Sequence, residues 1–302
     1  MKKFNNVIKG TLILTTAGIL SKILGFFYRI YLSRCIGAAG MGLFQIVMPA
    51  AGIVFAICSS GIQTAISKFC CDKKNDFLWL ISGLLLSIPT SLILTFIVYT
   101  NADFIATRFI LNEACSSLLK ILSLSFPFAA FHNCINGFYF AKKKTAIPAF
   151  SQLFEQIIRF FAVYIYVTIY ASDGNASVLC AIYSNLFGEI ASFLYCTCAI
   201  FYTFIKSKCN NTHKKSSLMS KIREMFKFSF PLTANRLLMH IFQSAEAVLV
   251  PAQLIVYGLS KSDSVSIYGI LTGMAMPLIL FPTALTNSLA VMLLPAVSEL
   301  NL

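Results

Sequence analysis

Apolar residues dominate the chain in long runs that short polar segments separate. Each run is at least about as long as the ~20 residues that a helix needs to cross a bilayer. The runs are too long, and alternate too little, to be the strands of a membrane barrel. The pattern therefore predicts eight membrane-spanning helices, at residues 10–33, 41–67, 77–99, 116–140, 147–170, 178–205, 226–256 and 266–297.

Composition indicates the same fold class. The 302 residues are 58% hydrophobic and 12% charged, with a mean hydropathy of +0.79, whereas soluble domains carry about 25% charged residues. One soluble core could not cover so much apolar surface, so we predict an all-α, polytopic membrane helix bundle. No P-loop, serine-hydrolase or zinc-protease motif occurs, and we expect neither an enzyme nor a cofactor. The ten cysteines lack metal-ligand spacing, so we predict small buried residues and no metal site.

Positive charge is distributed unevenly among the connections between these runs. Sixteen of the 24 lysines and arginines lie in the N-terminal segment and in every second connection after it. The alternate connections hold only Arg34, Arg108 and Lys261. Cytoplasmic connections are rich in Lys and Arg, so we predict a multi-pass protein with its N-terminus in the cytoplasm. The net charge of +13 then reflects topology, and we expect contacts with membrane lipids and none with nucleic acid.

One connection, residues 206–224, is long, polar and basic. It predicts a six-helix lobe at 1–205, a cytoplasmic linker at 206–224, and the first two helices of a second lobe at 225–302. A weak internal repeat agrees, because Gly42–Pro49 resembles Gly269–Pro277. Both helices start on the same side of the membrane, so we expect an axis along the membrane normal to relate the two copies.

Small and polar residues form one stripe along the first predicted helix. They recur at intervals of three or four, at Thr11, Thr15, Gly18, Lys22, Gly25 and Arg29. A charged side chain at the bilayer centre costs roughly 2.5–3.5 kcal/mol on insertion scales, so it is kept away from lipid. The stripe indicates either a water-filled cavity that accepts an anion, or a packed interface in which acids neutralise Lys22 and Arg29.

A second polar group lies on the fifth and sixth predicted helices. Glu155 and Arg159 are four residues apart, in the order that favours an ion pair on a helix. The pair either joins helices or forms part of a headgroup site or gate. Glu189, on the next helix, is a candidate proton or cation site, or a partner for Lys22 or Arg159.

Further residues complete the predicted site. Three more are expected to line the cavity: Gln45, Arg236 and Gln243. Three are hinge candidates, since glycine and proline interrupt regular helix geometry: Gly25, Pro49 and Pro277. His132 is expected to be a hydrogen-bonded core residue rather than a ligand. Cations outnumber acids inside the predicted spans, which favours an anionic substrate such as a lipid pyrophosphate, held by bidentate arginine.

Several stretches match a known family. Ser21–Arg29, Gly40–Gln45, Gly61–Lys68, Glu155–Arg159 and Ser229–Arg236 resemble the stage V sporulation protein B group, and the likeness covers essentially the whole chain. That group belongs to the superfamily of polysaccharide exporters and lipid-linked oligosaccharide flippases, with multidrug and toxin extruders as distant relatives.

This resemblance implies an alternating-access flippase of the bacterial cytoplasmic membrane. It would move an undecaprenyl-linked cell-wall or polysaccharide precursor outward, in sporulation, driven by a coupling cation or the membrane potential. Lys22, Arg29, Arg159 and Arg236 would line its central cavity. Members have two six-helix lobes, so we expect a C-terminally truncated chain: a fragment, a split gene product or a decayed gene.

Two alternatives remain open. A cation-coupled multidrug extruder of the same superfamily would need acids in a cavity without the cations of the first helix. A membrane remnant or partner subunit would not transport at all.

Overall fold

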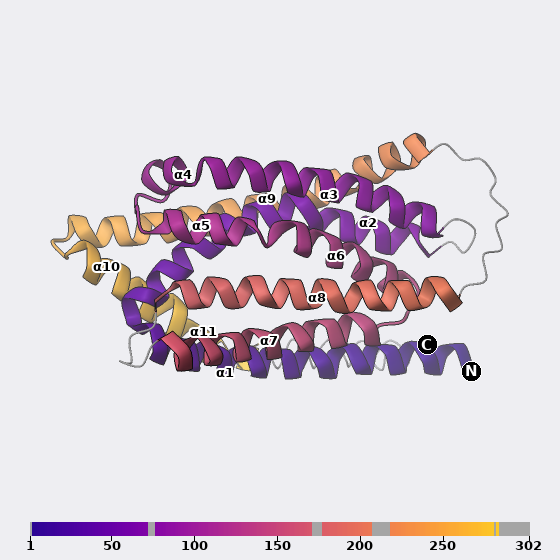
Figure 1. The fold of residues 1–302 in the computed structure, drawn as a ribbon, viewed down its shortest axis with the longest axis horizontal. Coiled ribbons are helices and arrows are strands. Elements are labelled where there is room, and N and C mark those ends of the chain that lie inside the picture. Colours follow the sequence, from indigo (N-terminus) through magenta and orange to yellow (C-terminus); the bar gives the residue numbers. More distant parts are fainter. Residues whose placement is uncertain (1, 72–75, 171–176, 207–217, 281, 284–302) are drawn as a thin grey trace, which may run out of the picture.

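The computed structural model describes residues 2–71, 76–170, 177–206, 218–280 and 282–283. These residues contain helices and no strands, with π-helical turns labelled η: α1 (Lys2–Phe55), η1 (Ala56–Ser60), α2 (Gly61–Phe69), α3 (Asp76–Thr100), α4 (Ala102–Arg108), α5 (Cys115–Ser123), α6 (Phe126–Ala141), α7 (Ala146–Tyr170), α8 (Leu179–Lys206), α9 (Leu218–Val256), α10 (Lys261–Tyr268), η2 (Gly269–Ala275) and α11 (Met276–Ile279). Figure 1 shows the long helices lying side by side along the longest axis of the molecule.

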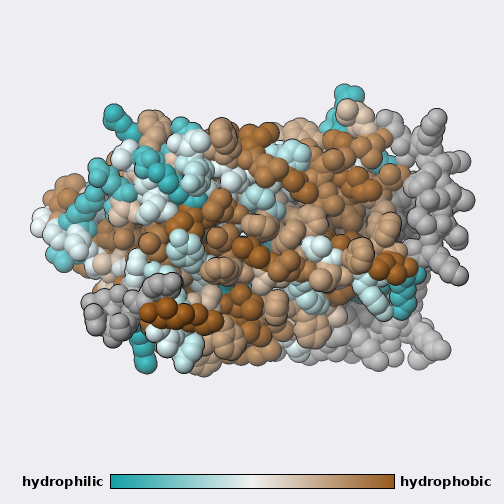
Figure 2. All heavy atoms as spheres, in the orientation of Figure 1, coloured by the Kyte–Doolittle hydropathy of each residue, from teal (hydrophilic) through white to brown (hydrophobic). Residues whose placement is uncertain are grey.

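The length and surface of the helices fit a membrane. Among the described residues, five helices are long and apolar enough to span it, or six if the bent pair α5–α6 counts as one span. Figure 2 shows hydrophobic residues over the middle of the bundle and hydrophilic ones gathered toward one end. Phe96, Phe201 and Phe242 are 65–70% exposed, which suits lipid rather than water. The predicted all-α, multi-pass membrane class is confirmed.

The first two predicted spans form one helical segment that reverses at Gly37. Thr16–Phe69 comprises 54 residues of apolar helix, which if straight would extend about 80 Å, well beyond the ~30 Å hydrocarbon core. Gly37 has φ 69° and ψ −176°, a conformation that residues with a Cβ rarely adopt. The chain turns back there (Figure 1), so this segment holds both predicted spans.

Other boundaries differ from the sequence prediction. The predicted span 116–140 is bent by 45° between α5 and α6, where a proline occupies the first turn of α6 and lacks only an N–H that has no helical partner. Helix α9 starts at Leu218, inside the predicted linker, because Lys221 and Met225 pack against the first lobe, with the Lys221 Nζ 4.9 Å from the Trp79 ring centroid. The described part of the last predicted span ends at residue 283, and the remainder lies outside the described residues.

Helix α6 is central in the bundle. Eleven of its 16 residues are buried, including the three largest fully buried side chains, Phe126, Phe138 and Tyr139. Its two buried polar residues, His132 and Asn136, therefore need protein partners. No disulfide joins any of the nine described cysteines, and most of them are buried as predicted, although Cys71 and Cys198 are exposed.

The equivalent glycines of the internal repeat pack against each other. A Cβ on Gly42 would lie 2.1 Å from the Val265 carbonyl oxygen, and one on Gly269 would lie 2.4 Å from the Gly42 nitrogen. Gln45 lies three residues after Gly42, and Thr272 lies three residues after Gly269. Gln45 Nε2 donates a hydrogen bond to the Thr272 carbonyl at 2.8 Å. Equivalent positions that touch lie beside the axis that relates two copies, so this contact is compatible with the predicted axis, and the repeat itself stays a prediction.

Candidate functional site

A cavity of about 600 Å³ lies between α1 and α7 on one side and η2 and α11 on the other. The two arms of α1 form two walls, α7 forms a third, and η2 with α11 closes the fourth side. Its lining is polar along α1 and α7 and more apolar along α11: Ser21, Lys22, Gly25, Phe26, Tyr28, Arg29, Phe44, Gln45, Met48, Gln152, Gln156, Arg159, Thr272, Met276, Pro277 and Leu280.

The lining is cationic. Lys22, Arg29 and Arg159 contribute side chains, and no acid is among the described residues that line the cavity. Lys22, Gly25 and Arg29 belong to the stripe on α1, whose helical spacing turns all three toward the same space. In the described part of the chain Arg29 has no ion-pair partner. The arrangement around Arg29 is thus that of a cavity wall rather than a neutralised helix interface.

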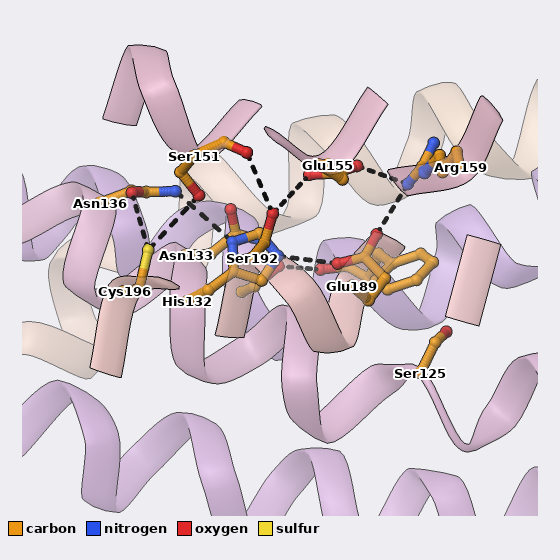
Figure 3. A network of polar contacts seen from close by, with 12 residues as sticks. Ser125, His132, Asn133, Asn136, Ser151, Glu155, Arg159, Glu189, Ser192 and Cys196 are labelled. Atoms are coloured by element: carbon orange, nitrogen blue, oxygen red, sulfur yellow. Dashed lines mark hydrogen bonds and ion pairs between the residues drawn. The ribbon is translucent and has the colours of Figure 1, made fainter. Parts of the chain in front are cut away.

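Behind this wall, Arg159 joins two carboxylates (Figure 3). Its Nη2 lies 2.5 Å from Glu155 Oε1 and 3.0 Å from Glu189 Oε1. The other oxygen of Glu189 lies 2.7 Å from His132 Nε2, and Ser192 Oγ donates to Glu155 Oε2 at 3.2 Å. All four charged or titratable side chains are at least four-fifths buried. The cluster therefore ties α6, α7 and α8 together beneath the cavity.

The charges of this cluster nearly balance. One guanidinium faces two carboxylates, and a protonated His132 would complete neutrality. Ligand atoms of His132, Glu155 and Glu189 all lie within 4.8 Å of one another, which is close enough for one metal ion. Arg159 already places a cation against both carboxylates, however, so a metal ion would have to displace the guanidinium.

The network settles which partners the sequence left open. Glu155 and Arg159 form the predicted pair, and Glu189 pairs with Arg159. His132 is hydrogen-bonded in the core, as predicted. Its contact with Glu189 was not predicted, since 57 residues separate the two and no pattern in the sequence relates α6 to α8 at that register.

The remaining sequence candidates divide into two groups. Gln45 and Pro277 line the cavity with Gly25, where a Cβ on Gly25 would lie 3.8 Å from Gln156 Oε1. The second group lies elsewhere in the structure: Pro49 within α1, and Arg236 and Gln243 on α9. Arg236 and Gln243 are exposed, and Gln243 Oε1 accepts from His240 Nδ1 at 3.1 Å.

Solved structures share this architecture. An inward-facing multidrug resistance MATE family transporter of the MOP superfamily aligns with a TM-score of 0.67, 14% identity, and coverage of 92% of this chain and 64% of its own. A MOP superfamily transporter from Pyrococcus furiosus aligns with a TM-score of 0.59 and 16% identity over 95% of this chain and 65% of its own. The fold is therefore that of multi-pass membrane transporters of the MOP superfamily.

The family follows from sequence. Residues 7–301 match the model of the polysaccharide biosynthesis protein family, and the chain belongs to that family. Stage V sporulation protein B of Bacillus subtilis (strain 168) is 28% identical over 97% of this chain, and lipid II flippase MurJ of the same organism is 23% identical over 98%. The chain spans 58% of the length of each of these two relatives.

Proposed function

We propose that this chain forms part of an alternating-access flippase that exports an undecaprenyl-linked cell-wall or polysaccharide precursor, in sporulation, and that the cavity receives its anionic headgroup. The observation that carries the proposal is the cationic lining of Lys22, Arg29 and Arg159 without an acid among the described lining residues. A cavity of this sign attracts a pyrophosphate and repels the lipophilic cations that a drug extruder would carry. The family match and the flippase named among its relatives support the same substrate class.

Two arginines have different roles in this proposal. Arg159 is held in place by Glu155 and Glu189, and its buried Nε has no hydrogen-bond partner among the described residues. A guanidinium fixed in advance loses little entropy when it binds phosphate. Arg29, which has no ion-pair partner in the described chain, supplies the charge that the substrate would neutralise.

The buried cluster supports a coupling role. A proton or small cation that entered between Glu155 and Glu189 would compete with Arg159 for the same oxygens. Arg159 lines the cavity, so its release would change both the charge of the substrate site and the contact between α7 and α8. The cluster is thus the proposed site of a coupling cation.

The placement of charge supports a cytoplasmic N-terminus. Helices α2, α6 and α8 end, and α9 begins, at the end of the bundle where the N-terminus lies (Figure 1). These ends carry Lys68, Lys142–Lys144, Lys206 and Arg223. Because cytoplasmic connections are rich in such residues, we assign this end to the cytoplasm.

Binding of undecaprenyl pyrophosphate to the purified chain in detergent tests the proposal. Arg29→Ala should weaken binding roughly 10- to 100-fold, since charge-assisted hydrogen bonds contribute about 1.5–3 kcal/mol each. Arg108→Ala, which removes an exposed cation far from the cavity, is the matched control. Equal affinity of the wild type and Arg29→Ala, or tighter binding of a lipophilic cation than of the pyrophosphate, would refute the cationic headgroup site. Arg236→Ala separately tests whether α9 contributes to binding.

A further inference from the structure

A second basic feature lies away from the cavity, where α3 begins and α6 and α8 end. A groove of about 430 Å³ opens there, lined by aromatic side chains, a threonine and three lysines: Phe77, Phe138, Tyr139, Lys142, Lys144, Tyr202, Thr203 and Lys206. It shares no lining residue with the cavity and has no acid in its described lining. The three lysines come from two chain segments that the fold brings to one mouth.

The groove has an apolar wall and a charged rim. Phe77 packs against Phe138 and Phe204 at ring-centroid distances of 5.4 and 5.8 Å. Phe204 and Tyr202 are 57% and 66% exposed on the outer side of α8. At the rim, Lys142 Nζ lies 5.5 Å from the Phe138 centroid, and Lys206 Nζ lies 5.9 Å from that of Tyr202. Cationic heads above aromatic faces, at the end of a span, lie at the depth of lipid headgroups.

The turn that connects Lys142 to Lys144 contains a residue with a strained backbone conformation. Lys144 N–H donates to the Tyr139 carbonyl and Lys143 N–H to the Phe140 carbonyl, both at 3.0 Å, which is the Schellman arrangement that ends a helix. The residue whose N–H makes the shorter of these two loops usually is glycine, because this position requires positive φ. Here it is Lys143, at φ 58°. Lys143 therefore carries backbone strain at the turn that separates Lys142 from Lys144.

We propose that this groove binds one anionic phospholipid of the inner leaflet, with the phosphate between Lys142, Lys144 and Lys206 and an acyl chain along Phe77 and Phe204. Charge complementarity selects the phosphate, since basic pockets between helices at the cytoplasmic side suit anionic headgroups. The exposed aromatic wall selects a lipid over a free phosphate. The inference is independent of the substrate of the cavity and depends only on the orientation of the bundle.

Native mass spectrometry of the whole chain, released from micelles that contain phosphatidylglycerol or phosphatidylcholine, tests this proposal. Each lysine near a membrane surface contributes about 1 kcal/mol toward an anionic lipid, so Lys142→Ala/Lys206→Ala should weaken phosphatidylglycerol binding roughly 10- to 30-fold. Arg223→Ala/Lys227→Ala removes two exposed cations at the same end of the bundle but outside the groove. This control should change binding by less than about 3-fold, because screened surface charges attract only weakly.

Four outcomes would overturn the proposal. Equal losses in both double variants would mean diffuse attraction to the basic end rather than a site. If Lys142→Ala/Lys206→Ala binds phosphatidylglycerol with unchanged affinity, or if Lys142→Arg/Lys206→Arg fails to bind it, the groove does not recognise the lipid. Soluble glycerol phosphate and a short-chain phosphatidylglycerol are compared as competitors for the bound lipid. If both displace it at the same concentration, the acyl chain makes no contact that contributes to binding. The proposal is supported if the chain retains phosphatidylglycerol and not phosphatidylcholine, and if only Lys142→Ala/Lys206→Ala loses the bound phosphatidylglycerol.

Discussion

The contact between Gly42 and α10 makes a sharp prediction, because two glycine-to-alanine changes in one helix should differ in their effect on stability. A Cβ on Gly42 would lie 2.1 Å from the Val265 carbonyl oxygen, and ordinary contacts begin at 3.4 Å. The helices would have to separate by about 1.3 Å, and overpacking of this kind costs about 1–3 kcal/mol. Among the described residues, a Cβ on Gly18 would meet nothing within 4 Å.

Alanine is favoured over glycine inside a helix by about 1 kcal/mol, and this gain applies to both variants. The difference between Gly42→Ala and Gly18→Ala therefore isolates the clash. At roughly 2–4 °C per kcal/mol, Gly42→Ala should melt roughly 2–12 °C below Gly18→Ala, and Gly18→Ala should melt at or above the wild type. Thermal denaturation of the purified chain in one detergent, at one scan rate, measures all three.

The double variant Gly42→Ala/Val265→Ala shows which atoms cause the loss. The nearest atom to the added Cβ is the Val265 carbonyl oxygen, which trimming the side chain leaves in place. The Val265 Cγ1, which Val265→Ala removes, would lie 2.6 Å from the same Cβ, so we expect partial recovery and not full recovery. If Gly42→Ala melts at the same temperature as Gly18→Ala, or if the double variant recovers fully, the close backbone approach of α1 to α10 is refuted.

Three further predictions concern charge and strain. Arg159→Gln should lower the melting temperature by the equivalent of about 3–5 kcal/mol, because it leaves buried carboxylates uncompensated. Glu155→Gln/Arg159→Gln should melt at a higher temperature than Arg159→Gln. Equal melting temperatures of these two variants would contradict the ion-pair geometry. Lys143→Gly should raise the melting temperature by the equivalent of roughly 1 kcal/mol, since it relieves the positive φ of Lys143, and a decrease would contradict the strain. A hydrogen bond from Lys120, and then one from Ser116, lowers the pKa of Asp103, which is exposed in the first turn of α4. The stabilising effect of the Asp103 carboxylate should thus be present above the ordinary aspartate pKa of about 3.9. It should be lost as the pH falls through the lower pKa that Asp103 has in the folded protein. The melting difference between wild type and Asp103→Asn should vanish at acid pH, and a difference that persists there unchanged would argue against this ion pair.

Local patterns predicted the parts of the site that local geometry controls. The stripe on α1 places Lys22, Gly25 and Arg29 on one wall because helical spacing alone decides which side chains share a face. The Glu155–Arg159 pair follows from the same four-residue spacing. Glu189 had two candidate partners, and no local rule chose between them, since the choice depends on how α7 and α8 pack.

The reversal at Gly37 shows a second limit. Hydrophobic runs predict where spans lie but not how one span leads into the next, and here a single glycine at positive φ replaces a loop. The early start of α9 has a similar cause: residues that read as a polar linker become helical because Lys221 and Met225 pack against the first lobe. Tertiary contacts outweighed local composition at both places.

By itself, the sequence determined the all-helical membrane class, the faces of the helices and the uneven distribution of basic connections, because periodicity and transfer free energy act on residues close in the chain. The tertiary structure decided which faces meet. It placed Lys22, Arg29 and Arg159 around one cavity, joined Arg159 to Glu189, and left Arg236 outside the lining. Those outcomes depend on packing between helices that are distant in sequence, where a shift of one residue in register would bring different side chains together.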